Sequence, residues 1–249
     1  MERTRGRDVR ARRGPRARAR VPTAVRGAAP PERRDPHGTR RALLAAGTRL
    51  FSRQGFEGVP IGAVAARAGV NKALISYHFG GKRGLYRAIL TAGLVDMVEQ
   101  LEAVVRANDD AERALRGLIA AFGRFRERRP EFAALFLREV LAHGVDSEVT
   151  PYLSRVVGAT RSVALLGMRQ GVFRRVNPVA LHFALFGALV SFVATAPARE
   201  RAAAAGRVPP MPAFAEFLRY LEELTLRGLR PDRRTPSSRS RDRRKGARA

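Results

Sequence analysis

Residues 59–82 read VPIGAVAARAGVNKALISYHFGGK, and this stretch decides the fold of the chain around it. The apolar spacing of its first half predicts a short helix, which Gly69 breaks. Asn71 is a favourable N-cap for a second short helix, which ends at His78 and Phe79 before two glycines. Two short helices joined by a tight turn are typical of a helix-turn-helix, whose second helix enters the major groove of DNA.

The segments around this stretch are also expected to be helical. Residues 40–54 have apolar positions at helical spacing, with Thr39 as a plausible N-cap and Gly55 as the stop signal. Lys82 begins a long helix, and residues 196–212 are expected to form a loop. The sequence predicts an all-α chain of about nine helices, with an N-terminal three-helix DNA-binding domain before a larger C-terminal helical domain.

Two helix starts in the C-terminal half have recognisable caps. Asn108 or Asp109 can cap the helix that follows the long one, since short polar side chains accept hydrogen bonds from free backbone N–H groups. Asn177 and Pro178 form a cap and first-position pair for a later helix.

The formal net charge of +26 is unevenly distributed. Residues 1–41 contribute +10 of it, and residues 227–249 contribute +8. Between these ends, residues 43–90 carry seven basic residues and one acidic residue, so the positive charge of the central part is concentrated on the helix-turn-helix segment. Because phosphate contacts dominate affinity for nucleic acids, this coincidence indicates DNA binding more specifically than the total charge does.

Both ends of the chain lack apolar periodicity and are predicted to be disordered. The N-terminal extension is either a basic arm that adds nonspecific DNA contacts or a solvated segment without a role of its own. The expected organisation is an Arg-rich disordered extension, a DNA-binding domain with its motif at about residues 60–79, a helical domain and a basic disordered tail: 1–36, 37–90, 91–229 and 230–249.

Several classes of protein are disfavoured by what the sequence lacks. It has no cysteine, which excludes disulfides and thiolate chemistry. It has no run of 18 uncharged apolar residues and no apolar core of a secretory signal, so we expect a cytoplasmic, nucleoid-associated protein without a membrane partner. Phosphate-binding loops, HExxH and nucleophile elbows are absent and the four histidines are dispersed, so we expect neither an enzyme nor a metal or cofactor site.

The segment from Thr39 to Leu90 resembles the TetR family of bacterial transcriptional regulators. The resemblance is carried by residues 68–90, AGVNKALISYHFGGKRGLYRAIL, and by the apolar and glycine positions between Ala45 and Ala65. It implies a homodimer that binds a pseudo-palindromic double-stranded DNA operator and responds to a small-molecule effector, and it favours a repressor over an activator. The C-terminal helices would then bind the effector and form the dimer.

The resemblance also implies roles for individual residues. Lys72, Ala73 and Leu74 occupy positions that face bases, which agrees with their chemistry, because lysine can donate to guanine and an apolar side chain can contact a thymine methyl group. Residues at positions that commonly contact phosphates are Ser76, Tyr77, His78 and Lys82, with Arg40 and Arg41 as further candidates. Alternatively, the Tyr77 side chain could pack partly in the small core of these helices.

The chain departs from the family pattern at the start of the first motif helix. Pro60, Ile61 and Gly62 stand where many members have threonines and another polar residue. The capping hydroxyl and one DNA contact are therefore missing, and the reading of bases is expected to depend on the second helix.

Two features of the C-terminal half suggest an effector pocket and a dimer face. Side chains that could line a pocket for a largely apolar effector, although each could equally pack in the core, are Phe122, Phe125, Phe136, Tyr152, Met168, His182 and Phe186. Small residues recur at helical spacing from Ala184 to Ala194, and an apolar stripe runs from Phe214 to Leu224. In the family, the last two long helices form a four-helix bundle across a two-fold axis.

Two other functions remain as alternatives. A nonspecific or architectural DNA-binding protein would depend on the basic ends, and its sequence preference would vanish with them. An enzyme that uses the apolar pocket would turn over its ligand, whereas a sensor would only bind it.

Overall fold

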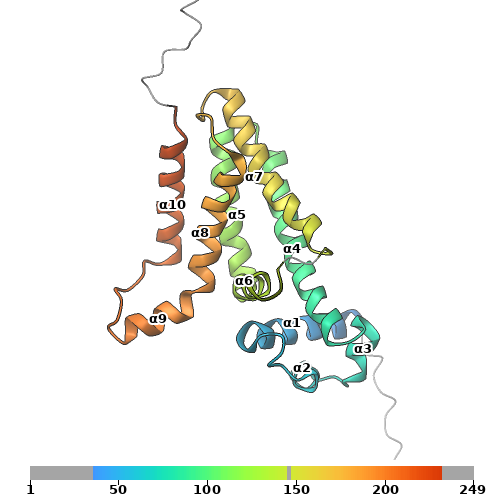
Figure 1. Cartoon of the computed structure of the whole chain (residues 1–249). Helices are drawn as coiled ribbons and strands as arrows, with labels where there is room; N and C mark the ends of the chain where they lie inside the picture. The colour runs from blue at the N-terminus through green and yellow to red at the C-terminus, as the bar shows by residue number, and fades with distance from the viewer. Residues whose placement is uncertain (1–35, 145–146, 232–249) are drawn as a thin grey trace, which may run out of the picture. The chain divides into compact units, whose positions relative to one another are not determined.

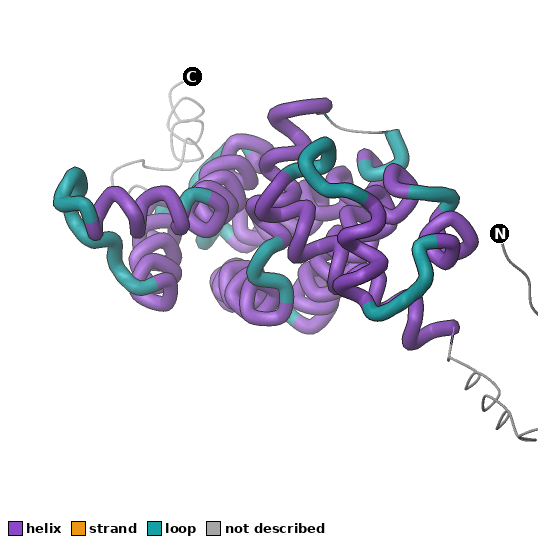
Figure 2. Tube along the Cα trace, turned by 90° about the horizontal axis from the view of Figure 1, so that it is seen from below, coloured by secondary structure: helices purple, strands orange, loops and turns teal. Residues whose placement is uncertain are grey.

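The computed structural model describes residues 36–144 and 147–231. Within these residues the chain forms ten α-helices and no strand. Figures 1 and 2 show how these helices are arranged. The predicted all-α class is therefore confirmed. The two predicted disordered ends lie outside the described residues except for Pro36, Arg230 and Pro231.

The first three helices pack around a small apolar core. They are α1 (Pro36–Gln54), α2 (Ile61–Ala68) and α3 (Ala73–Phe79). Each helix contributes to the core because its apolar residues recur on one face, and these fully buried side chains are Leu43, Phe51, Val64 and Ile75. Burial of one such side chain contributes about 1.5–3 kcal/mol, so these few residues stabilise helices that are too short to be stable alone.

The predicted N-cap of α1 is wrong. The helix begins at Pro36, and Thr39 is buried inside it. Proline is favourable in the first turn of a helix, where its missing N–H has no partner to lose.

The remaining seven helices follow in chain order. The long helix α4 runs from Lys82 to Ala107 without a break at the domain boundary predicted after residue 90. The others are α5 (Ala111–Arg128), α6 (Phe132–His143), α7 (Thr150–Gln170), α8 (Pro178–Ala194), α9 (Ala196–Ala204) and α10 (Phe214–Leu229).

One of the predicted caps is found and the other is displaced. Asn177 Oδ1 accepts hydrogen bonds from the backbone N–H groups of the first turn of α8, at 2.9 and 3.2 Å. The cap of α5 is Asp110, which accepts from Arg113 N at 2.7 Å, so the expected caps Asn108 and Asp109 are wrong. Asn108 instead donates to Val104 O at 2.7 Å and closes the end of α4.

The expected loop after α8 contains a helix. α9 follows Thr195 directly and has Pro197 in its first turn. Its alanines have a high intrinsic preference for helix, which explains why this stretch is ordered as a helix without a buried face. Among the described residues no single helix is long and apolar enough to cross a membrane, and the pair α8 and α9, bent by 54°, meets the criteria only by combined length and composition.

Two glycines allow other parts of the chain to approach α4 very closely. A Cβ atom at Gly84 would lie 1.7 Å from the carbonyl oxygen of Phe79, which ends α3. A Cβ atom at Gly93 would lie 1.9 Å from Cε2 of Phe132 on α6. A side chain at Gly84 would therefore push α3 away, and one at Gly93 would displace the Phe132 ring.

Candidate nucleic-acid interface and internal cavity

The turn between α2 and α3 has a fixed geometry. Gly69 ends α2 with φ +66°, and Val70 N donates to Ala65 O at 3.0 Å. Asn71 Oδ1 then accepts from Ala73 N at 2.8 Å and caps α3, as its sequence position predicted. A left-handed glycine followed by a side-chain cap sets the orientation of α3 relative to α2.

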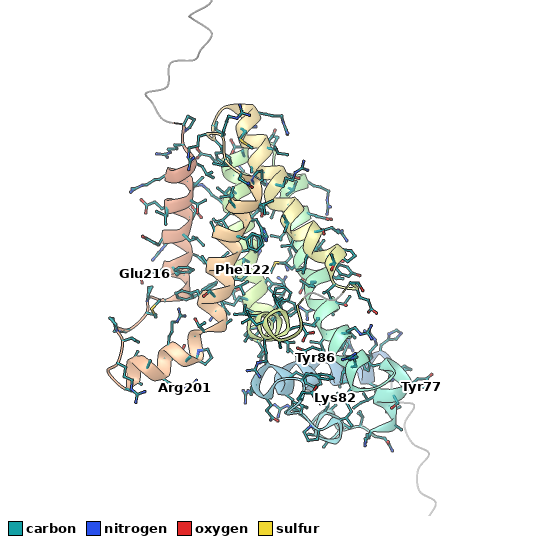
Figure 3. All side chains as sticks on the ribbon, in the orientation of Figure 1. Tyr77, Lys82, Tyr86, Phe122, Arg201 and Glu216 are labelled. Atoms are coloured by element: carbon teal, nitrogen blue, oxygen red, sulfur yellow. The ribbon has the colours of Figure 1, made fainter. Side chains whose placement is uncertain are left out.

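The helix α3 has one packed face and one exposed face. Ile75 is buried and Leu74 packs partly against the core. Lys72, Ala73 and Ser76 are exposed, and Tyr77 is 81% exposed and points away from the neighbouring helices (Figure 3). The alternative that places Tyr77 in the core is therefore excluded, and four of the predicted contact residues share one open face of α3, while Leu74 and His78 are half-buried.

Two cations at the edges of α3 are held by aromatic rings. The Lys82 ammonium lies 4.5 Å from the centroid of the Phe56 ring, and its Nζ donates to Glu57 O at 3.4 Å. The Arg40 guanidinium lies 5.4 Å from the centroid of Phe79. Cation–π contacts of this kind hold a charge in place and leave other N–H donors free for an anion such as phosphate.

The other two predicted backbone contacts differ in exposure. Arg41 is exposed on α1, whereas His78 is half-buried, with its ring 5.0 Å from that of Tyr77 and 6.1 Å from that of Phe79. At the start of α2, Pro60 makes no side-chain capping bond, and Gly62 faces open space. The start of α2 therefore has no side-chain cap, and the missing DNA contact stays a prediction.

Tyr86 connects α6 with the start of α4. Its ring centroid lies 5.1 Å from that of Phe51 and 5.0 Å from that of Phe56. Burial and a hydrogen bond to Glu139 of α6 raise the pKa of Tyr86 above its usual range. Phe56 also contacts Lys82, so each of four residues contacts the next: Glu139, Tyr86, Phe56 and Lys82. We call these four residues the Tyr86 bridge. The sequence pattern did not indicate this connection.

An internal cavity of about 90 Å³ lies among α4, α5, α6, α7 and α8. Five of the seven residues predicted for a pocket line it, namely Phe122, Phe125, Phe136, His182 and Phe186. Phe122 lies in the interior among these helices (Figure 3).

Tyr152 and Met168 do not line this cavity. The residues of α7 that line the cavity are Leu153 and Val156. Tyr152 is adjacent to Leu153 and is therefore turned by about 100° around the helix, whereas Met168 lies about 18 Å along the helix from Val156. The predicted pocket is corrected at these two positions.

The polar groups at the cavity differ in charge. Thr160 Oγ1 lies 3.1 Å from His182 Nδ1, and burial lowers the pKa of His182 to about 4, so this imidazole is neutral at pH 7. Two arginines of α5 and its end, Arg126 and Arg129, also line the cavity. Partial burial acts to raise the pKa of Asp96, but its hydrogen bonds and ion pairs with Arg129 and Arg128 hold that pKa below its ordinary value.

His182 should make the stability of the protein depend on pH. Its folded-state pKa of about 4 is below the ~6.5 of an unfolded chain, so below pH 6.5 the unfolded chain binds a proton that the folded one does not. The contribution of neutral His182 to the free energy of unfolding is fully present above pH 6.5. It falls by about 3 kcal/mol as the pH is lowered to 4. Urea unfolding of the protein and of His182→Gln across this range measures the effect. An unchanged pH slope in the variant would contradict this role.

An apolar face on α8 and α10 is open in the single chain. Phe183 is 66% exposed, Tyr220 is 62% exposed and Leu224 is 54% exposed. The two helices lie side by side (Figure 1). A groove of about 700 Å³ runs between them, and small side chains such as Ala184 form part of its wall. Within the predicted stripe Leu221 is buried, whereas Leu224 faces outward beside the exposed Tyr220, which was not predicted as part of the stripe.

Among the residues that the structure describes, no group of three or more His, Asp or Glu side chains is placed to hold a metal ion. The two sites that remain are the exposed face of α3 and the internal cavity. The first can donate hydrogen bonds and positive charge to DNA, and the second can enclose an apolar group beside two arginines.

Comparison with known proteins gives consistent matches. Residues 43–89 match the family described as "Bacterial regulatory proteins, tetR family". The HTH-type transcriptional repressor NicS of Pseudomonas putida is 29% identical over 197 residues, which cover 77% of this chain and 92% of NicS. The HTH-type transcriptional repressor SCO4008 of Streptomyces coelicolor is 26% identical over 173 residues, or 68% of this chain and 84% of that protein.

A solved structure extends the likeness beyond the DNA-binding helices. The TetR family transcriptional regulator PfmR from Thermus thermophilus superposes with a TM-score of 0.61 at 25% identity. The match covers 76% of this chain and 99% of PfmR, so it includes the helices around the internal cavity.

Proposed function

Because the chain belongs to the TetR family of bacterial transcriptional regulators, we propose that it is a homodimeric repressor that reads an operator with α3 and responds to a small effector in its internal cavity. The observation that carries this proposal is the exposed face of α3. A short helix, capped at its start and held by a left-handed glycine turn, presents Lys72, Ala73, Ser76 and Tyr77 to solvent.

The exposed residues of α3 divide by chemistry into two roles. Lys72 and Ala73, with the outer part of Leu74, are suited to contact base edges and fix the sequence that is read. Side chains with hydroxyl, imidazole or cationic groups are suited to phosphates and fix position on the duplex, namely Ser76, Tyr77, His78, Lys82, Arg40 and Arg41.

A dimer would place two copies of α3 in successive major grooves. In helix-turn-helix dimers the half-sites lie about 34–36 Å apart, or a multiple of this distance. The open apolar face of α8 and α10, centred on Phe183, Tyr220 and Leu224, supports a two-fold interface between these helices. Repression rather than activation is supported by the names of NicS and SCO4008, both of which match over most of their length.

The response to an effector would be transmitted by α6. Phe132 and Phe136 of α6 line the cavity, and Glu139, one turn further along, is the first member of the Tyr86 bridge. An effector that binds more tightly to the dimer geometry in which the two α3 helices do not fit the operator would shift the population to that geometry. Because Tyr86 contacts Phe56 and Phe56 contacts Lys82, a movement of α6 would change the position of Lys82.

Selection of bound DNA from a random pool tests the assignment of roles on α3. We expect Lys72→Ala to relax the preference at one base position, at a cost of about 1–3 kcal/mol there. Lys82→Ala should weaken binding to all sequences alike and reduce the salt dependence by about one unit of slope. An unchanged selected sequence for Lys72→Ala would show that Lys72 does not contact a base.

The same selection tests the alternative of a nonspecific DNA-binding protein. Removal of residues 1–35 and 232–249 takes away most of the net positive charge but leaves every described helix intact. A sequence-specific regulator keeps its preferred operator after this truncation and loses only overall affinity. If the preference disappears with the basic ends, the specific regulator is excluded.

A further inference from the structure

The internal cavity adjoins a second pocket, and Arg126 lines both. The second pocket, of about 400 Å³, lies where α5, α8, α9 and the segment before α10 meet, and we call it the vestibule. Its lining includes Arg199 of α9 and the rings of Phe192 and Phe214. One arginine therefore stands where an apolar chamber meets a more polar one.

Within the described part of the chain, Arg126 differs from its neighbour Arg129 in having no acidic partner. Arg129 Nε donates to Asp96 Oδ2 at 2.7 Å, so its charge is compensated. Arg126 forms no ion pair among the described residues, and its guanidinium lies 4.5 Å from the centroid of Phe214. A half-buried cation that stacks on a ring and has no counterion among the described residues can bind an anion through charge-assisted hydrogen bonds.

The vestibule contains a second guanidinium that has no acidic partner in the part of the chain that the structure describes. Arg199 lies 4.4 Å from the centroid of Phe192, and its Nη2 donates to Phe192 O, but its Nε is buried without a hydrogen-bond partner among the described residues. Glu200 also lines the vestibule, but it is exposed and pairs with neither arginine in the part of the chain that the structure describes. A buried N–H without a partner is costly, and an acceptor on a ligand would remove that cost.

The cavity itself does not suit a charge. Its lining is aromatic and aliphatic apart from His182 and the two arginines, and burial keeps His182 neutral at pH 7. A carboxylate placed deep in such a chamber would lose its hydration without compensation. The charged end of a ligand must therefore stay beside Arg126, while its apolar end occupies the cavity.

We propose that the effector is a small amphipathic carboxylate, whose apolar ring or short chain fills the cavity and whose carboxylate binds Arg126 with Arg199 beside it. This inference rests on the proposed effector response and specifies the chemical class of the effector. The cavity volume of about 90 Å³ is smaller than the ~150 Å³ cavity that accommodates benzene, so a single ring with slight widening is the upper size. A planar guanidinium matches a carboxylate through two parallel N–H···O bonds.

Isothermal titration of the full chain with three single-ring ligands of similar size tests this proposal. Benzoate carries a negative charge, benzyl alcohol is neutral and benzylamine is positive. We expect benzoate to bind at least about tenfold more tightly than benzyl alcohol, because a charge-assisted hydrogen bond contributes more than a neutral one. Benzylamine should bind most weakly of the three.

Two matched variants of α5 assign the preference to one side chain. Arg126→Met keeps the apolar stem but removes the charge, and it should bind benzoate no better than benzyl alcohol. Arg124→Met removes an exposed arginine two residues earlier and should keep the preference. Equal binding of benzoate and benzyl alcohol by the unaltered protein, binding of none of the three, or an anion preference that survives in Arg126→Met would each overturn the proposal.

Operator binding, measured separately, distinguishes failure of this inference from failure of the proposed function. Both variants should bind operator DNA as the unaltered protein does when no ligand is present, since Arg126 and Arg124 lie outside the helix-turn-helix. If benzoate binds with the expected preference but does not release DNA, the anion site stands and the proposed effector response fails. If another ligand releases DNA while benzoate does not bind, the response stands and the carboxylate assignment fails.

Discussion

Leu224→Glu should convert the proposed dimer to a monomer and lower its affinity for operator DNA by about 100-fold or more. Leu224 is 54% exposed on the open apolar face of α8 and α10, next to Tyr220. In a two-fold interface each substitution occurs twice, so two carboxylates would be buried without partners. The loss of DNA affinity follows because two linked recognition helices bind about 10²–10⁴ times more tightly than one.

Sedimentation equilibrium and titration of operator DNA measure the two effects. Leu141→Glu is the matched control, because Leu141 is 77% exposed on α6 and does not line the groove between α8 and α10. The control should remain dimeric and bind DNA normally. If Leu224→Glu stays dimeric with unaltered affinity, the interface lies elsewhere.

The second large effect is expected at Gly84. A Cβ atom there would lie 1.7 Å from Phe79 O and 2.9 Å from Phe79 C, and both are backbone atoms that no side-chain rotation can move. Gly84→Ala should therefore separate the end of α3 from the start of α4 and destabilise the protein by about 3 kcal/mol, the upper end of the usual cost of overpacking. Operator binding should be lost with it, because the same junction positions α3 and Lys82.

Gly62→Ala makes the same chemical change on α2, where no atom lies within 4 Å of the added methyl group. Alanine is about 1 kcal/mol more favourable than glycine inside a helix, so this variant should be as stable as the original protein or more stable. Denaturant unfolding and operator titration of the two variants provide the comparison. Equal stability of Gly84→Ala and Gly62→Ala would show that the junction can relax.

The sequence was sufficient for features that are encoded locally. The turn at Gly69, the cap at Asn71 and the inward position of Ile75 all depend on residues within a few positions of each other, and the structure has all three. The pair Asn177 and Pro178 opened a helix as expected for the same reason. Local hydrogen bonding and backbone preference decide these features, and both can be seen in a short window.

The errors occurred where tertiary packing or a choice between equivalent residues decides. Any of three consecutive polar residues could cap α5, and the structure uses Asp110. Tyr152 and Met168 belong to a helix whose rotation depends on its neighbours, so aromatic or sulfur character alone could not place them at the cavity. Tyr86 and Glu139 are far apart in the chain, and no local pattern could indicate their contact.

If the Tyr86 bridge couples the cavity to the DNA-binding helices, operator binding also changes the affinity of the protein for its effector. Coupling between two binding sites is reciprocal, so any factor by which the effector weakens operator binding is also the factor by which the operator weakens effector binding. Protein bound at its operator would then need more effector to respond than protein free in the cell. The effector concentration needed for derepression would therefore lie above the concentration that half-saturates unbound dimers, and unbound dimers would take up the first molecules of effector.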